Sequence, residues 1–327
     1  MTDVVIVEAV RTPIGRLRGG LSGVRADDLG AIVLQELIRR TGIEPRQVDD
    51  VVFGCVTQVG EQCGNVARTA LLAAGWPIEI PGMTVDRKCG SSEAAIHTAA
   101  GAIASGQHDI VVAGGVESMS RVPMGGNRDV HGQPFGTRLA ARFEIVSQGE
   151  AAERISDRWS LSRSQLDDYA IASHERAAAA ADSGRFDGQI VAVDVKDWRE
   201  GGGDGPSARV ARDETIRRDT SREKLGTLKT SFRPDGRITA GNSSQISDGA
   251  AAILLMSGAM AAELGVKPKA RIRAITTVGS DPTLMLTGPI AATKRALDRS
   301  GLGIDDIDLF EVNEAFARRC RIARRPG

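Results

Sequence analysis

The sequence predicts an α/β fold with a largely parallel β-sheet, because short apolar runs rich in β-branched residues alternate with helical patterns. The runs at 3–10, 48–56 and 108–118 are typical of buried strands. Helical patterns separate the first run from the second and the second from the third. A weak internal repeat adds that this α/β unit occurs twice along the chain.

The first expected helix, 26–42, carries the signals of both helix ends. Aspartates lie in its first turn, arginines lie in its last turn, and Gly42 follows as a stop signal. A short strand is then expected within "GMTVD" (82–86). A helix rich in small residues should follow it and end near Gly106.

Residues 121–240 differ from the flanking sequence, because glycine-rich and charged stretches surround one helical segment at 162–184. We interpret this region as an inserted, loop-rich domain. The expected organisation is an N-terminal domain formed by 1–120 and 241–266, the inserted domain, and a C-terminal domain at 267–327.

The repeat aligns residues 37–54 with 296–313 at a constant offset of 259. Gly42 then matches Gly301, and a strand that begins at Val48 matches one that begins at Ile307. Residues 267–281 would supply the opening strand of this second copy. The sequence ends before the second copy reaches the equivalent of position 89. We therefore expect an incomplete C-terminal half with an open sheet edge and uncovered apolar surface.

The amino-acid composition of the chain limits the classes of partner and the cellular locations that fit it. The chain has 42 basic and 42 acidic residues, a balance that argues against nucleic acid or an acidic membrane surface as the main partner. No apolar run is long enough to span a bilayer, and acids near the N-terminus argue against a signal peptide. Five arginines among the last ten residues leave RNA or DNA binding by the tail open, beside the commoner alternative of a solvated terminus.

The four cysteines show no CxxC or Cys/His spacing, so we expect no metal site and a reduced, cytoplasmic setting. Cys89 lies between an expected strand and an expected helix. Amides at the start of a helix stabilise a thiolate, Gly90 permits a tight turn, and Arg87 and Lys88 can add positive potential. The pattern therefore favours an activated nucleophile, and a buried, inert cysteine stays open as the alternative.

A general base for Cys89 is not evident from the sequence. His97 lies eight residues further along the helix, about 12 Å away and roughly 80° around its axis. His108, His131 and His174 lie in no recognisable motif.

Six ordered segments carry a family resemblance. They are "EAVRTPIGRLRGGLSG" (8–23), "CGSSEAAIHTAAGAI" (89–103), "VVAGGVESMSRVP" (111–123), "LKTSFRPDGRITAGNSSQISDGAAAILLMS" (228–257), "TGPIAATKRAL" (287–297) and "EVNEAFA" (311–317). Through them the chain resembles the thiolases, which are acyl-CoA acyltransferases, over nearly all of residues 3–317.

The resemblance implies roles for three residues. Cys89 matches the nucleophile that carries the acyl group as a thioester. Asn313 matches the asparagine that holds a water in an oxyanion hole for the enolate of the second acyl-CoA. Ser244 matches a serine that contacts the pantetheine arm of coenzyme A. For Ser244 an alternative is a cap on a helix beginning near Asp248, and for Asn313 an alternative is bonding to backbone groups at a strand end.

The resemblance also implies an architecture and partners. The expected fold is the duplicated thiolase fold, with five layers in the order α/β/α/β/α and a loop domain that covers coenzyme A. The expected assembly is a homodimer or tetramer. Coenzyme A and acyl-CoA are expected as substrates, with no permanently bound cofactor and no metal.

The chain departs from the family after "NEAFA". Thiolases carry a histidine in a "GHPxGxSG"-type segment and a second cysteine in a "CxGGG"-type segment, and neither occurs here. Cys320 lies in "RRCRI", so we do not assign it the second role. Because an acid or base residue commonly supplies roughly 10²–10⁴-fold of the rate, we expect acylation at Cys89 with impaired turnover. The alternative is a non-catalytic acyl-CoA-binding protein, or a subunit that partners an intact thiolase.

Overall fold

The computed structural model describes residues 3–128, 131–198 and 209–317, which form two compact units. The sheet unit comprises 1–131, 186–215 and 246–272, and the helical unit comprises 132–185, 216–245 and 273–327. Residues 186–215 thus cluster with the sheet unit although they lie within the sequence insertion. The predicted three-domain division stays a prediction.

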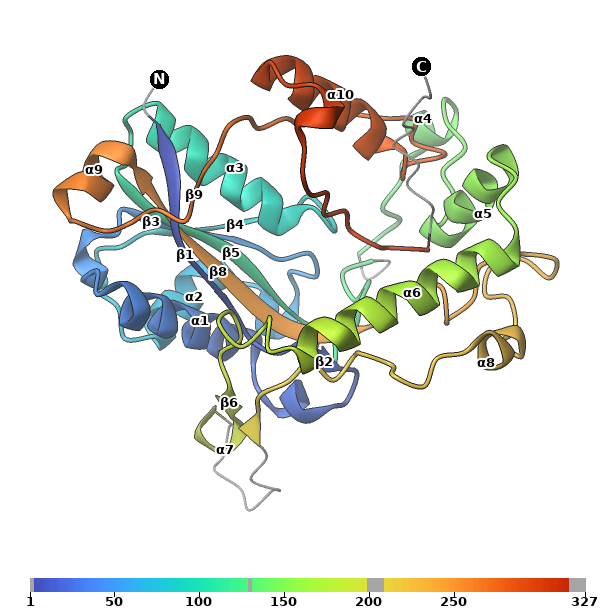
Figure 1. Ribbon diagram of the computed structural model, residues 1–327, viewed down its shortest axis with the longest axis horizontal. Coiled ribbons are helices and arrows are strands. Elements are labelled where there is room, and N and C mark those ends of the chain that lie inside the picture. The colour runs from blue at the N-terminus through green and yellow to red at the C-terminus, as the bar shows by residue number, and fades with distance from the viewer. Residues whose placement is uncertain (1–2, 129–130, 199–208, 318–327) are drawn as a thin grey trace. The chain divides into compact units, whose positions relative to one another are not determined.

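The sheet unit is built on a seven-stranded sheet in the order β4-β3-β5-β8-β1-β9, with β2 paired to β8 (Figure 1). Its strands are β1 (Val4–Arg11), β2 (Gly15–Arg16), β3 (Asp50–Gly54), β4 (Gly82–Val85), β5 (Ile110–Ser118), β8 (Ser247–Ser257) and β9 (Ala270–Arg271). The four strands expected from the first part of the sequence are therefore confirmed as β1, β3, β4 and β5.

The sheet is mixed, so the prediction of a largely parallel sheet is wrong in one respect. Strand β3 runs parallel to β4 and β5, but β8 lies between β5 and β1 and is antiparallel to both. The expected helix near Asp248 is also wrong, because 247–257 forms β8 and the helix that follows is α9 (Gly258–Glu263). A continuous apolar run such as "AAAILLM" does not distinguish a buried strand from a buried helix by its periodicity.

Helices cover both faces of the sheet (Figure 1). Helices α1 (Ala26–Thr41) and α2 (Val66–Ala73) pack on one face, where Leu29 and Leu37 join the larger core. Helix α3 (Ser91–Ala104) packs on the opposite face through a second core that contains Ala95 and Ile103. The smaller elements of this unit are η1 (Gly20–Gly23), η2 (Pro45–Gln47), η3 (Gly60–Gln62), β6 (Val193–Asp194), α7 (Val195–Trp198) and β7 (Arg209–Val210).

The helical unit has its own core around α6, in which Leu166, Leu225, Ile238 and Phe316 are buried. Its elements are α4 (Thr137–Ala140), α5 (Gln148–Arg158), α6 (Arg163–Asp182), α8 (Arg222–Gly226), α10 (Gly288–Ser300) and η4 (Ile304–Asp306). The helix expected within 162–184 is confirmed as α6, which begins after a capping box formed by Ser162 and Gln165.

The two strands expected in the C-terminal half are largely absent from the described residues. Of 267–281, only β9 forms a strand, and it pairs with β1. The strand expected from Ile307 does not form within the described part of the chain, and Leu309 is 89% exposed. A strand requires a neighbour for its backbone hydrogen bonds, and the described residues provide none for this segment.

The described residues contain α, β and α layers around the one large sheet. A second β layer, which the five-layer arrangement requires, is not among them. Within this same part of the chain, no helix combines the length and apolarity needed to cross a bilayer.

Candidate active site

Cys89 lies in a tight turn between β4 and α3, and its side chain is exposed. The alternative of a buried, inert cysteine is therefore wrong. Gly90 is the residue that precedes the helix, and α3 then continues for 14 residues. The first amides of a helix have no partner within it and carry partial positive charge, so this position favours an anion.

Ser91 holds the turn around Cys89 in shape. Its hydroxyl accepts a hydrogen bond from the Arg87 amide at 2.8 Å and donates one to the Lys88 carbonyl at 2.6 Å. Lys88 has a φ of +51°, a left-handed conformation that costs a non-glycine residue roughly 1–3 kcal/mol. The buried Ser91 side chain thus stabilises a strained backbone next to the cysteine.

Two glycines allow α3 to approach the sheet this closely. Gly54 and Gly115 are paired in register on β3 and β5. A Cβ at Gly54 would lie 2.4 Å from the Ser92 amide nitrogen, and one at Gly115 would lie 2.2 Å from the Ser92 hydroxyl. Any side chain at either position would push the first turn of the helix, and with it Cys89, away from the sheet.

The charged residues around the turn are themselves paired. The Lys88 ammonium contacts Asp86 at 2.5 Å, so its charge is not simply available to Cys89 as the sequence suggested. His97 lies 3.8 Å from Glu93 on its own helix, and burial lowers the pKa of its imidazole. That His97 is not the base for Cys89 stays a prediction.

A second cysteine near the end of β3 has the opposite environment. Cys55 is buried, and burial together with the charge of Glu117 raises the pKa of its thiol to about 12. Glu117 accepts hydrogen bonds from the Val56 and Thr57 amides and from the Gln62 side chain. Glu117 therefore holds the loop after β3, and Cys55 stays a thiol at neutral pH.

In the helical unit, the structure brings the segments of Ser244 and Asn313 together. The Ser244 amide donates to the Ala315 carbonyl at 2.9 Å, and Ser243 forms an antiparallel bridge with Phe316. The side chains of Ser244 and Asn313 are both exposed. The structure thus places the two predicted ligand-contacting residues on adjoining segments with solvent access.

The two structural alternatives for these residues do not hold. Ser244 caps no helix, because the segment that follows it leads into β8. Asn313 does not lie at a strand end, since 307–315 contains no strand. Cys320 lies outside the described residues.

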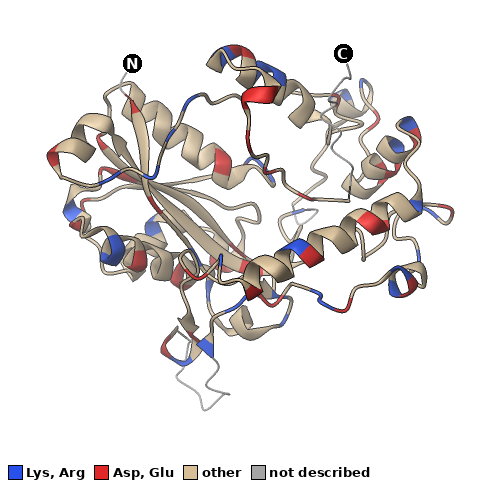
Figure 2. Cartoon of the chain, viewed as in Figure 1, with Lys and Arg blue, Asp and Glu red and all other residues tan. Residues whose placement is uncertain are grey.

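No group of three or more His, Cys, Asp or Glu side chains within the described ranges is arranged to hold a metal ion. Charges of both signs are interspersed along α1, α6 and α10, whereas the strands of the large sheet are mostly uncharged (Figure 2).

Sequence reasoning missed the residues that support the site. Ser91 was visible only as part of "CGSS", and the left-handed Lys88 carries no sequence signal, because lysine has no preference for that conformation. Asn242 was part of a recognised segment, yet its contact with Asp167, 75 residues away, could not be read from spacing.

Comparisons with known proteins give one consistent result. Residues 4–259 match the family described as thiolase, N-terminal domain, and residues 266–325 match that described as thiolase, C-terminal domain. The steroid 3-ketoacyl-CoA thiolase FadA6 of Mycobacterium tuberculosis is 44% identical over 327 residues, an alignment that covers 97% of this chain and 77% of that protein.

Two further proteins show the same similarity. The 3-ketoacyl-CoA thiolase of Pectobacterium carotovorum is 46% identical over 320 residues, with 97% of this chain and 81% of that protein covered. The crystal structure of the Bacillus anthracis acetyl-CoA acetyltransferase matches with a TM-score of 0.87 at 39% identity, covering 97% of this chain and 81% of that one.

Proposed function

The chain belongs to the thiolase family of acyltransferases, and from that premise we propose that Cys89 accepts an acyl group from an acyl-CoA. The observation that carries the proposal is the exposed Cys89 thiol at the start of a 14-residue helix. Its turn is held by Ser91 in a conformation that the backbone would not adopt unaided.

The proposed reaction begins with attack of the Cys89 thiolate on the thioester carbonyl. Backbone amides stabilise the oxyanion that forms. The C–S bond to coenzyme A then breaks, the coenzyme A thiolate takes up a proton, and the acyl group remains on Cys89 as a new thioester. In this proposal Ser244 contacts the pantetheine arm, and Asn313 holds a water that stabilises the enolate of a second acyl-CoA.

The second half of the reaction has two directions. In a Claisen condensation, the carbanion of acetyl-CoA attacks the acyl group on Cys89. In thiolysis, the acyl-enzyme forms instead when Cys89 attacks the 3-keto carbon of a 3-ketoacyl-CoA, so that the C2–C3 bond breaks and acetyl-CoA leaves as an enolate that takes up a proton. Coenzyme A then removes the shortened acyl group from Cys89. The similar proteins named as 3-ketoacyl-CoA thiolases support 3-ketoacyl-CoA as the substrate class. The family resemblance further supports a homodimer or tetramer that acts in the cytoplasm without a permanently bound cofactor.

Both directions of the reaction pass through the acyl-enzyme, so the formation of a thioester on Cys89 is the step on which the proposal depends. The specific alternative, that the chain binds acyl-CoA without reacting, makes the acylation step the one to test.

Radiolabelled acetyl-CoA tests the proposal, with Cys63 as a matched control because it is the other exposed cysteine in the described residues. We expect up to one label per chain, its loss in Cys89→Ala by about 100-fold or more, and its retention in Cys63→Ala. Cys55 should stay unlabelled at pH 8, because its thiol pKa is about 12.

Label that survives Cys89→Ala would refute the role of Cys89. Binding of coenzyme A without any label would support the non-catalytic alternative.

A further inference from the structure

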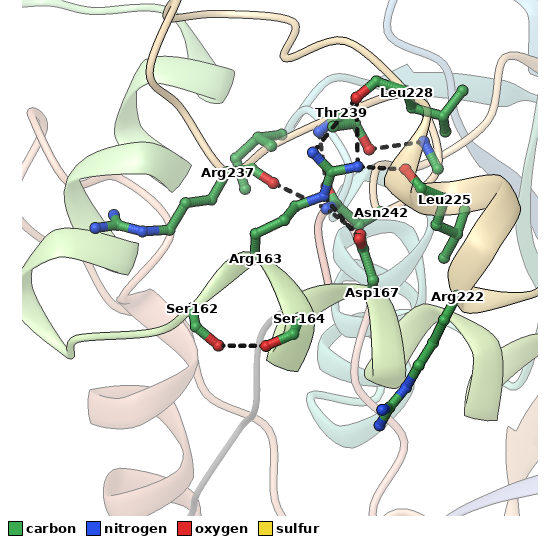
Figure 3. Close-up of polar contacts among 12 residues, drawn as sticks. Ser162, Arg163, Ser164, Asp167, Arg222, Leu225, Leu228, Arg237, Thr239 and Asn242 are labelled. Atoms are coloured by element: carbon green, nitrogen blue, oxygen red, sulfur yellow. Dashed lines mark hydrogen bonds and ion pairs between the residues drawn. The ribbon is translucent and has the colours of Figure 1, made fainter.

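Helix α6 carries a buried carboxylate that no step of the proposed reaction uses. Asp167 is 5% exposed. Its two oxygens accept hydrogen bonds from Arg163 Nε at 2.7 Å and from Asn242 Nδ2 at 2.9 Å (Figure 3). Burying a carboxylate costs free energy unless strong donors satisfy it, so these two contacts offset the cost of burying Asp167.

Asn242 connects Asp167 to the loop that carries Ser244. Its side-chain amide also donates to the Arg237 carbonyl at 3.0 Å, and its carbonyl oxygen accepts from the Thr239 amide at 2.9 Å. The side chain of Asn242 therefore joins the backbone of Arg237 and Thr239 to Asp167 on α6.

The same asparagine reaches the segment of Asn313 through its backbone. The Asn242 carbonyl accepts a hydrogen bond from the Ala317 amide at 2.8 Å. Together with the bond between the Ser244 amide and the Ala315 carbonyl, this contact pairs 242–244 with 315–317 as two short extended segments. A displacement of Asn242 would thus move both segments.

Helix α6 also holds the residue next to Asn313. The Glu314 carboxylate accepts hydrogen bonds from the Tyr169 hydroxyl at 2.9 Å and from the Ser173 hydroxyl at 2.6 Å. These contacts lie on the exposed side of the helix, whereas the Asp167 contact is buried. Asp167 is therefore the anchor with the larger expected effect.

We propose that Asp167 is a positioning residue for coenzyme A binding, which fixes the loops of Ser244 and Asn313 through Asn242. The inference rests on the proposed function in that it takes these two loops to face coenzyme A. Asp167 itself touches no ligand in this scheme.

Asp168 provides a matched control on the same helix. Its carboxylate forms a bidentate pair with Arg222 at 2.6 and 2.7 Å, but its side chain is 41% exposed and that of Arg222 is 76% exposed. Exposed ion pairs contribute little to stability. Asp168→Asn thus removes the same charge one residue away without loosening either loop.

The experiment measures two quantities for wild type, Asp167→Asn and Asp168→Asn. The first is the dissociation constant for coenzyme A by calorimetry, and the second is amide hydrogen exchange in peptides covering 239–246 and 311–317. An asparagine at 167 turns an NH₂ group toward one of the two donors and leaves that donor unpaired. We expect about tenfold weaker binding and about tenfold faster exchange in both peptides, against changes within about twofold for Asp168→Asn.

A double variant, Asp167→Asn with Asn242→Asp, exchanges the two side chains. It distinguishes a positioning role of Asp167 from a general folding defect. It restores one carboxylate and one amide at the contact, but the bond to the Arg237 carbonyl is lost and Arg163 faces a neutral amide in place of a carboxylate. We expect this double variant to recover part of the lost affinity and of the lost protection. Recovery of the melting temperature without recovery of affinity would overturn the positioning role.

Equal effects of Asp167→Asn and Asp168→Asn, or unchanged exchange in both peptides, would also overturn the inference. Failure of the proposed function would give a different experimental result. In that case the wild-type protein would show no acetyl label on Cys89, while exchange and coenzyme A affinity would still report on Asp167.

Discussion

Two segments with the same sequence pattern, 37–54 and 296–313, begin alike in the structure. Helix α1 ends at Thr41 and α10 ends at Ser300, and the glycine that follows each helix has a φ of +69°. A 3₁₀-helix comes next in both copies, at Pro45–Gln47 and at Ile304–Asp306, which preserves the offset of 259. The internal repeat is therefore confirmed over the helix end and the turn.

The two segments then differ. Residues 50–54 form β3 between β4 and β5, and Phe53 is fully buried. Residues 309–313 form no strand, and Leu309 and Phe310 are 89% and 50% exposed. Helix ends and tight turns follow from local signals, whereas a strand forms only where neighbours complete its hydrogen bonds and cover its side chains.

The largest effect that this comparison predicts concerns its two phenylalanines. Phe53→Ala should destabilise the sheet unit by about 3–5 kcal/mol, because it removes a fully buried ring and leaves a cavity. Phe310→Ala should change stability by no more than about 0.5 kcal/mol, because half of its side chain is already in water. Urea titration, with hydrogen exchange of the β5 amides as the local probe, measures both.

Similar losses for the two variants would mean that 309–313 is packed as β3 is, which would contradict the exposure of Phe310.

The comparison also indicates which parts of the fold the sequence could predict. Strands β1, β3, β4 and β5, helices α1, α3 and α6, and the stop at Gly42 follow from apolar runs, end signals and glycines. The direction of β8 could not be predicted, because its pairing depends on residues more than 100 positions away.

The candidate site likewise contains some features that the sequence predicts and others that it does not. Cys89 could be located from the sequence because a strand, a glycine and a helix follow one another locally. The left-handed conformation of Lys88, whose carbonyl accepts a hydrogen bond from the Ser91 hydroxyl, could not be predicted. The contact between Asp167 and Asn242 likewise depends on how two distant segments pack.

A smaller loss of stability should follow from replacing the glycine after the helix, and it should be equal in the two segments. Gly42 and Gly301 share a φ of +69°, and apart from the adjacent residues of the chain no heavy atom of the described residues lies within 4 Å of a Cβ built at either position. Gly42→Ala and Gly301→Ala should therefore each cost about 1 kcal/mol from backbone strain alone. Hydrogen exchange in the last turns of α1 and α10 measures the two costs, and a difference of more than about twofold would show that tertiary packing also contributes to these helix ends.

The smallest expected effect concerns Asp50, the first residue of β3, and Leu309, the residue that matches it in the second segment. Burial raises the pKa of Asp50, mainly because β3 removes its carboxylate from water. A carboxyl group whose pKa is higher in the folded state stabilises the protein fully at pH values below its unfolded pKa, near 3.9. This contribution is lost as the pH rises through the folded pKa.

Asp50→Asn should therefore raise the free energy of unfolding at pH 7, by less than about 1 kcal/mol, and the gain should vanish below about pH 4. The equivalent position in the second segment is Leu309, which is 89% exposed and carries no charge. Leu309→Asn should accordingly leave stability nearly unchanged at both pH values. Urea titrations at pH 4 and pH 7 compare the two variants, and a destabilised Asp50→Asn at pH 7 would show that the bond from the Val51 amide outweighs the burial of the carboxylate.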